Sequence, residues 1–208
     1  MNRLFKSSLL LVLVLLIAGC NTMQTSSHSE PTAPVLSRIQ QRGELVLGTS
    51  ANMPPMTFTQ NGKAVGFDID MAHLMADVMD VRLNVKTLPF GELLPALQRG
   101  DVDLVISNMT ITPERNKKVA FVGPYLTSGK CLVSKNEQLA RAAEADHLNR
   151  PETRIAVLKG STSERFVRTL LPKATVTTTD DVASGVQLVI DDRVGAMLSE
   201  YPICLSTL

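Results

Sequence analysis

Residues 66–79, GFDIDMAHLMADVM, contain the clearest helix signal in the chain. Apolar residues within this stretch recur at positions 71, 74, 75, 78 and 79, which is the spacing of side chains on one face of a helix. The pattern predicts a helix from Asp68 to Met79. We expect Asp68 to be its N-cap, and Asp70 lies where the helix dipole favours an acid. His73 falls on the polar side and is expected to be solvated.

Strand and helix signals alternate outward from this helix. The run 103–107 (DLVIS) is apolar on both faces, as in a covered parallel sheet, whereas two prolines make 52–55 a loop. Such alternation is typical of an α/β layer with parallel strands. The other strands expected in this half are 44–49, 56–59, 64–67 and 81–88, and the other helices are 35–42 and 92–99.

The same alternation repeats after residue 129. The sequence therefore predicts two α/β units with a junction near Pro124 to Gly129. The strands expected in the second unit are 130–134, 154–158, 175–178 and 194–198, and the helices are 137–147, 163–171 and 182–191.

The first twenty residues carry an export signal. Arg3 and Lys6 precede an almost unbroken apolar run at 9–18, which is short for a membrane span of about 20 residues and typical of a secretory signal. An uncleaved anchor helix is the alternative. Residues 16–20 (LIAGC) resemble the bacterial lipobox. That resemblance implies a signal peptide at 1–19 and acylation of Cys20 as the first mature residue.

Composition separates the signal from the folded part. Ser, Thr and Pro dominate residues 21–35, so we expect a disordered tether at 20–37. The full chain has 21 basic and 20 acidic residues, and loss of residues 1–19 leaves 19 basic residues against the same 20 acidic ones. This balance provides no basic field for nucleic acid, and no nucleic-acid partner is expected.

Two cysteines lie beyond the lipobox, at Cys131 and Cys204. An exported compartment permits a disulfide between them, but the sequence does not show whether their Cα atoms come within about 7 Å. A disulfide and two buried free thiols both stay open. No Cys/His spacing suggests a metal site, and we expect neither a metal nor a cofactor.

Residues 66–76 resemble the signature of the bacterial extracellular solute-binding proteins of family 3, which bind polar amino acids and related solutes for ABC importers. The resemblance covers about residues 38–208. It implies an α/β fold of the two-lobed, periplasmic-binding-protein-like type II, in which each lobe is a mostly parallel sheet flanked by helices. Lobe 1 is expected at 38–127 and lobe 2 at 128–208. Further matches follow in order at 89–90 with 94–103, at 107–115 and at 159–162.

This resemblance implies a non-enzymatic function. The expected protein captures a polar amino acid or related small zwitterion by hinge closure and passes it to an ABC permease in the inner membrane. It would be a monomer, anchored through Cys20 on the periplasmic side of a cell membrane. The alternatives are a cyclohexadienyl or arogenate dehydratase-like enzyme on the same fold and a ligand-sensing domain. Against an enzyme, none of the histidines at 28, 73 and 147 lies within a binding motif, and no hydrolase pattern is present.

The loop at 107–115 combines hydroxyl groups, backbone N–H groups and one guanidinium at the carboxyl end of a buried strand, where α/β sheets place ligands. Thr112 is suited to N-cap a helix that starts with Pro113. The family resemblance implies that Arg115 holds the ligand α-carboxylate and that Asn108, Thr110 and Thr112 also bind the ligand. The alternative is that Arg115 only decorates a helix start.

Lobe 2 is expected to complete the site. Ser161 and Thr162 open a helix whose N–H groups suit the same carboxylate, although a plain N-cap explains them as well. By resemblance Glu200 binds the ligand ammonium, where an Asp is usual in the family; an ordinary exposed Glu is the alternative. Phe90 would cover the apolar part of the ligand.

Two positions depart from the family pattern. Met53 stands where many relatives carry an aromatic residue, and Ser50 where many carry Asp. Because methionine adapts to many shapes, we expect a broader or less polar pocket, with a packing role for Met53 as the alternative. The family chain also returns from lobe 2 to lobe 1, and this chain stops at Leu208, so lobe 2 is expected to be incomplete.

Overall fold

The computed structural model describes residues 33–141 and 144–207. The predicted signal peptide, the predicted acylation site at Cys20 and most of the expected tether lie outside the described residues. Helix α2 (Pro34–Arg42) begins within the expected tether, so residues 34–37 are helical. In the part of the chain that the structure describes, no helix is long and apolar enough to cross a membrane.

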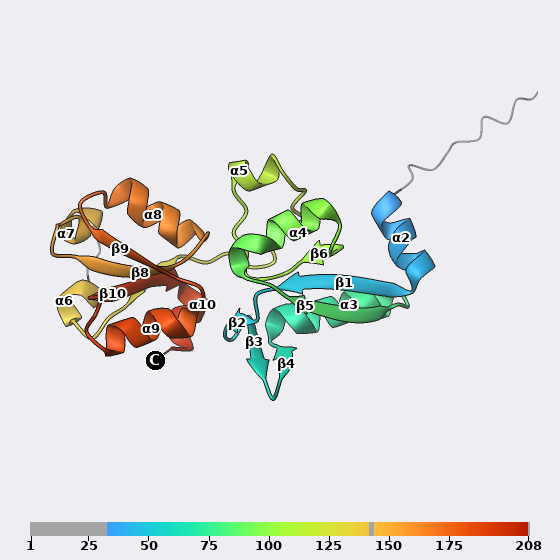
Figure 1. Cartoon of the computed structure of the whole chain (residues 1–208), viewed down its shortest axis with the longest axis horizontal. Helices are drawn as coiled ribbons and strands as arrows, with labels where there is room; N and C mark the ends of the chain where they lie inside the picture. Colours follow the sequence, from blue (N-terminus) through green and yellow to red (C-terminus); the bar gives the residue numbers. More distant parts are fainter. Residues whose placement is uncertain (1–32, 142–143, 208) are drawn as a thin grey trace, which may run out of the picture. The chain divides into compact units, whose positions relative to one another are not determined.

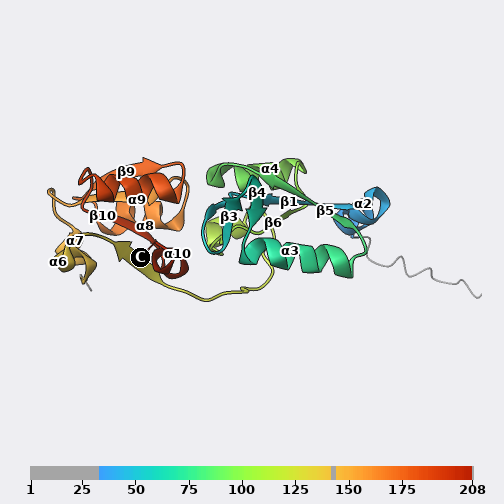
Figure 2. The same ribbon diagram turned by 90° about the horizontal axis from the view of Figure 1, so that it is seen from below.

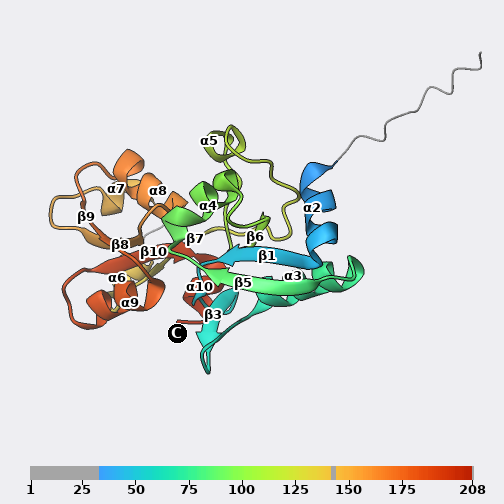
Figure 3. The same ribbon diagram turned by 45° about the vertical axis from the view of Figure 1, so that its right-hand side comes forward.

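Lobe 1 is built on a parallel sheet with the strand order β5-β1-β6 (Figure 3). The central strand is buried because its alternating side chains meet a helix on each face. Leu47 packs with Ile69 and Ala72, whereas Val46 packs with Ala96. The elements are β1 (Glu44–Thr49), β5 (Arg82–Thr87), β6 (Leu104–Val105), α3 (Phe67–Val78) and α4 (Leu93–Arg99), preceded by the 3-10 turn η2 (Phe90–Glu92). The partners of Leu47 and Val46 belong to the helices α3 and α4, which lie on opposite sides of the strands in Figure 2.

A small antiparallel sheet stands beside these strands. It contains β2 (Asn52–Met53), β3 (Thr57–Gln60) and β4 (Lys63–Val65). The hairpin of β3 and β4 confirms the sequence prediction. The prediction of a loop over 52–55 was wrong for Asn52 and Met53, which pair with β3 before the prolines begin.

The predicted N-cap of α3 was also wrong. The helix begins at Phe67, and Gly66 is its N-cap, with φ of 117° and no side-chain capping bond. The Asp68 carboxylate instead accepts hydrogen bonds from residues far along the chain. A third correction concerns the strand predicted over 103–107. The observed strand, β6, contains only two residues, and both are half-buried.

Lobe 2 has the strand order β7-β10-β8-β9, in which β7 is antiparallel to its neighbour and the other pairings are parallel (Figure 1). Ile155 and Val157 pack with Val167, whereas Ala156 packs with Val182 and Val189 on the other face. The strands are β7 (Lys130–Val133), β8 (Arg154–Leu158), β9 (Thr175–Thr179) and β10 (Ala196–Glu200); the helices are α6 (Glu137–Ala140), α7 (Ala145–Leu148), α8 (Thr162–Leu170), α9 (Val182–Ile190) and α10 (Tyr201–Leu205).

Two expectations for lobe 2 need correction. The continuous helix predicted over 137–147 is divided into α6 and α7, with a turn at Arg141. Strand β10 lies two residues later than predicted, so Glu200 is the last residue of the strand rather than part of the following loop. A shift by two residues keeps the same side chains on the same face, which is why the apolar pattern alone did not resolve it.

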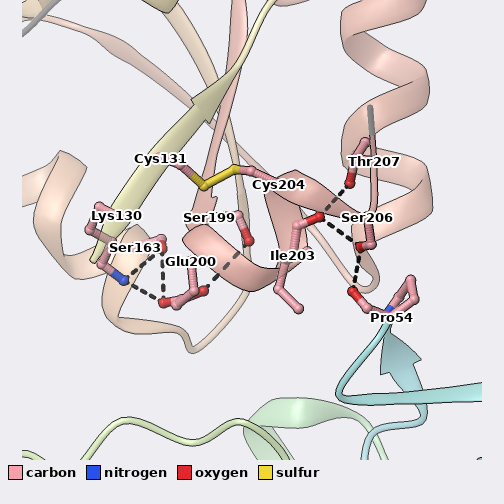
Figure 4. The surroundings of a disulfide bond; sticks show 10 residues. All are labelled: Pro54, Lys130, Cys131, Ser163, Ser199, Glu200, Ile203, Cys204, Ser206 and Thr207. Carbon is pink, nitrogen blue, oxygen red and sulfur yellow. Dashed lines mark hydrogen bonds and ion pairs between the residues drawn. A yellow bond between two sulfur atoms is a disulfide. The ribbon is translucent and has the colours of Figure 1, made fainter. Parts of the chain in front are cut away.

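Cys131 and Cys204 form a disulfide, with their Cα atoms 6.4 Å apart (Figure 4). Strand β10 pairs with β7 and runs directly into α10, so the chain brings Cys204 back to β7. Of the two alternatives that the sequence left open, the disulfide is therefore the one that the structure contains.

Candidate ligand-binding site

The carboxyl ends of β1 and β6 carry the first group of candidate residues. Ser50 and Ser107 are buried, and they bind each other: the Ser107 hydroxyl accepts from the Ser50 N–H at 3.0 Å and lies 3.0 Å from the Ser50 hydroxyl. This pair ties the 107–115 loop to β1. The Ser50 side chain is thus used inside lobe 1.

A hydrogen bond between Asn108 and Asp68 holds the next residues of the 107–115 loop in place. The backbone N–H of Asn108, which has a positive φ of 46°, donates to the Asp68 carboxylate at 2.8 Å. The Tyr125 hydroxyl donates to the other carboxylate oxygen at 2.9 Å. Burial raises the pKa of Asp68 to about 6, although both of these hydrogen bonds lower it. The carboxylate joins the start of α3, the loop and the segment between the lobes.

Arg115 lies in the short helix α5 (Pro113–Asn116). As predicted, Thr112 is its N-cap and accepts from the Arg115 N–H at 3.2 Å. The guanidinium donates to the Thr110 carbonyl at 2.7 Å and to the Gly160 carbonyl at 3.1 Å, and its carbon lies 5.6 Å from the centre of the Phe90 ring. Arg115 therefore contacts the first loop of lobe 2 as well as its own loop.

The start of α8 faces Arg115 from lobe 2. Ser161 is the N-cap and accepts from the Glu164 N–H at 3.1 Å, so its hydroxyl has a capping role. The hydroxyl of Thr162 lies 3.3 Å from that of Thr110. Gly160 has a φ of 75°, and a Cβ atom added there would lie 3.3 Å from the Cα atom of Gly91. The two lobes thus approach closely at this loop.

Glu200 and Lys130 form an ion pair that the sequence reasoning missed. The Lys130 ammonium lies 2.5 Å from the Glu200 carboxylate and donates to the Ser163 hydroxyl at 2.8 Å (Figure 4). It also donates to the Thr162 hydroxyl at 2.8 Å. Both charged side chains are partly exposed, at 27% and 19%. Lys130 lies directly opposite Glu200 in the pairing of two strands. The two residues are 70 positions apart, so only knowledge of that strand pairing could have identified Lys130 from the sequence.

Phe90 and Met53 lie in one apolar cluster. They are 6% and 2% exposed, and the same cluster includes Ala156, Met197 and Ile203 from lobe 2. Met53 is therefore buried among apolar neighbours in this structure, and its role in lining a pocket stays a prediction. Phe90 packs in the same cluster while its ring stays beside the Arg115 guanidinium.

The structure therefore brings some of the predicted site residues together, whereas the hydroxyls of others are used in hydrogen bonds within their own lobe. Arg115, Thr110, Thr162, Glu200 and Phe90 lie near the Gly160 loop, joined by Lys130. The hydroxyls of Thr112 and Ser161 accept from backbone N–H groups of their own lobes, and the Ser50 hydroxyl binds that of Ser107. The buried side-chain nitrogen of Asn108 has no hydrogen-bond partner among the described residues.

A metal site and other pockets are the remaining candidates among the described residues. Over residues 33–141 and 144–207, no group of three or more His, Cys, Asp or Glu side chains is placed to hold a metal ion. A shallow surface hollow is lined by Gly43, Val81 and Arg82 together with two aspartates. It lies at the amino ends of β1 and β5, the ends opposite the Arg115 loop.

Two α/β lobes with polar loops at their strand ends define a solute-binding protein of the type II periplasmic fold. Residues 45–196 match the family model of the bacterial extracellular solute-binding proteins, family 3, and the chain belongs to this family. The family and the fold implied by the motif at 66–76 are confirmed.

Known relatives include binding proteins and an enzyme. The arginine-binding extracellular protein ArtP of Bacillus subtilis (strain 168) is 30% identical over 190 residues, which cover 90% of this chain and 72% of ArtP. The cyclohexadienyl dehydratase of Pseudomonas aeruginosa is 26% identical over 183 residues, which cover 88% and 68% of the two chains. The crystal structure of the ancestral amino acid-binding protein AncCDT-1, a precursor of cyclohexadienyl dehydratase, has a TM-score of 0.77 and 38% identity, over 81% of this chain and 74% of that one.

Proposed function

We propose that this chain captures a polar amino acid or a related small acid by closing two lobes around it, and that the closed form delivers the ligand to an ABC permease. The observation that carries the proposal is the convergence of charged groups from both lobes on one loop. Arg115 of lobe 1 donates to the Gly160 carbonyl, and Glu200 of lobe 2 contacts the hydroxyl of Thr162 at 3.3 Å.

The chemistry of these groups suits a small carboxylic acid. A guanidinium binds a carboxylate through two parallel hydrogen bonds, and the start of α8 adds N–H groups with a favourable dipole. The two carbonyls that Arg115 now contacts are neutral acceptors, which a ligand carboxylate would replace with a charged one. Contacts from both lobes exist only in the closed form, so a ligand that uses both shifts the population toward closure.

The first prediction concerns Arg115. In Arg115→Gln, we expect the affinity for the best-bound ligand to fall about 10- to 100-fold, because hydrogen bonds to charged groups contribute about 1.5–3 kcal/mol. The measurement is calorimetric titration with L-arginine, L-glutamine, L-glutamate and 4-carbamoylbutanoate. Arg99→Gln is the matched control, since Arg99 is exposed in the same lobe and pairs with Asp101. Equal affinities for the two variants would contradict the role of Arg115.

The dehydratase alternative is favoured by the similarity to cyclohexadienyl dehydratase. A dehydration of this kind needs a general acid. Glu200 is arranged as an acceptor, since Lys130, Thr162 and Ser163 all present donors to the same carboxylate oxygen. We therefore infer a binding protein, and an assay with prephenate and arogenate decides the question: turnover that Glu200→Gln abolishes would establish the enzyme instead.

Export and anchoring belong to the same proposal. The run at 9–18 and the lipobox-like residues 16–20 support cleavage before Cys20 and its acylation. The anchored protein would act as a monomer on the periplasmic side of a membrane. Mass spectrometry of the mature N-terminus tests this: an acylated Cys20 is expected, and an unmodified Met1 would refute it.

A further inference from the structure

Lys130 already occupies the position that an ammonium group would take at Glu200. Its nitrogen has three acceptors at hydrogen-bond distance, namely the Glu200 carboxylate and the hydroxyls of Thr162 and Ser163. An ammonium group has three donors, so these contacts use all of them. The arrangement is that of a ligand ammonium bound to its acid, except that the ammonium belongs to the chain.

The backbone holds this pair in place. Lys130 and Glu200 are direct partners in the antiparallel pairing of β7 with β10, and opposite charges in that position attract across the strands. The Tyr201 N–H donates to the Gly129 carbonyl at 2.9 Å, and the neighbouring Cys131 is bonded to Cys204. Lys130 is thus fixed beside Glu200 by a strand pairing and a covalent link.

The charges around the Gly160 loop do not cancel. Glu164, which accepts from the Gly160 N–H, is paired with Arg168, and Glu114 is paired with Arg165. Three charged groups contact Thr110, Thr162 or Ser163, namely the Arg115 and Lys130 cations and the Glu200 anion. Together they leave one positive charge.

We propose that Lys130 acts as a built-in ammonium group at Glu200, so that the site selects small carboxylic acids of net charge −1 over neutral or cationic amino acids. Two kinds of ligand carry this charge: an amino acid with a second carboxylate, and a monocarboxylate that lacks the amine. This inference rests on the proposed function and names the ligand class of that site. Charge complementarity acts through specificity, because a like charge in a partly desolvated site is rejected.

The test uses four acids whose net charges differ. These are L-glutamate and 4-carbamoylbutanoate, which carry −1, and L-glutamine and L-arginine, which carry 0 and +1. 4-Carbamoylbutanoate is L-glutamine without its amine, so this pair isolates the ammonium group. We expect one or both of the −1 acids to bind about tenfold or more tightly than L-glutamine and L-arginine. The one that binds identifies which kind of ligand the site takes.

Substitution of Lys130 then tests whether this residue causes the preference for acids of net charge −1. In Lys130→Gln, Glu200 loses its ammonium partner, and we expect the preference for the −1 acids over L-glutamine to shrink about tenfold or to reverse. Lys135→Gln is the matched control, because Lys135 is an exposed lysine of the same lobe that pairs with Asp192. In Glu200→Gln, the Lys130 cation remains without its acid, and the preference for the −1 acids is expected to be kept or strengthened. Circular dichroism verifies that each variant is folded.

Each other outcome overturns the inference. If the wild type prefers L-glutamine or L-arginine, the proposed function stands and the ligand class is wrong. If Lys130→Gln leaves the preference unchanged, Lys130 only supports the strand pairing. If no acid of the four binds to any of the variants or the wild type, the proposed function fails together with the inference.

Discussion

At the residue scale, Asp68 has a role in tertiary contacts that the residues next to it in the sequence do not indicate. A helix start with an acid predicted an N-cap. The side chain is 0% exposed and instead receives the Asn108 N–H and the Tyr125 hydroxyl, from the binding loop and from the segment between the lobes. Burial raises the pKa of Tyr125 as well, and the charge of Asp68 adds to that effect. This part of lobe 1 is therefore sensitive to protonation.

The prediction that follows is a pH dependence of stability. Because burial raises the Asp68 pKa from 3.8 to about 6 in the folded state, the folded state holds the proton more tightly than the unfolded state. The stabilising contribution is present below pH 3.8 and is lost as the pH rises to about 6. A shift of this size corresponds to about 3 kcal/mol of unfolding free energy.

Asp68→Asn removes this titration. Urea unfolding between pH 4 and pH 7 is expected to show that the variant gains stability relative to the wild type as the pH rises. Asp70→Asn is the control, because Asp70 is exposed in the same first turn of α3. Parallel pH profiles for Asp68→Asn and the wild type would contradict the raised pKa.

At the element scale, periodicity located most helices and strands, and tertiary contacts adjusted their ends. Strand β8 has the bounds that were predicted, since it is buried between helices and its apolar run is continuous. Helix α3 begins earlier than predicted because Gly66, with its positive φ, makes the turn from β4 into the helix. Strand β10 is displaced by two residues because its bounds follow its pairing with β7 and β8.

Gly66 gives a testable case at this scale. A Cβ atom there would lie 2.6 Å from the Met56 carbonyl oxygen and 2.7 Å from that of Pro55, and both are backbone atoms. Gly66→Ala is therefore expected to lower the unfolding free energy by about 2–5 kcal/mol, the combined cost of overpacking and a strained φ. In the control Gly62→Ala, the positive φ remains but no atom lies within 4 Å, so the cost is about 1–2 kcal/mol. Equal losses in chemical denaturation would disprove the steric argument.

At the scale of the whole molecule, the disulfide and the contacts between lobes organise distant parts of the chain. The Ser206 hydroxyl donates to the Pro54 carbonyl at 2.6 Å, and Asn52 donates to the Asp180 carbonyl at 3.2 Å. These contacts join the β2 region to α10 and to the start of α9. They lie beside the apolar cluster that Met53 and Phe90 share with residues of lobe 2, so both polar and apolar contacts join the lobes in this structure.

Removal of the disulfide tests how lobe 2 is stabilised. The bond closes a loop over a sequence separation of 73 residues. The chain-entropy relation for a loop of this length predicts that Cys131→Ala together with Cys204→Ala lowers the unfolding free energy by about 4 kcal/mol. Urea unfolding of the double variant measures this loss, and the reduced wild type should show a similar one. A double variant as stable as the oxidised wild type would show that the disulfide contributes nothing to lobe 2.

Short-range patterns were enough to predict most helices and strands, the two α/β units, the family and the composition of the binding loop. These follow from signals within a few turns or strands: apolar spacing, the N-caps Thr112 and Ser161, and the motif at 66–76. Only the tertiary structure decided the pairing of Lys130 with Glu200, the Cys131–Cys204 bond and the burial of Asp68. The physical reason is that each of these contacts joins residues 40 to 73 positions apart. Local periodicity shows which face of a strand is apolar, but the direction and register of its neighbour arise only when the sheet forms.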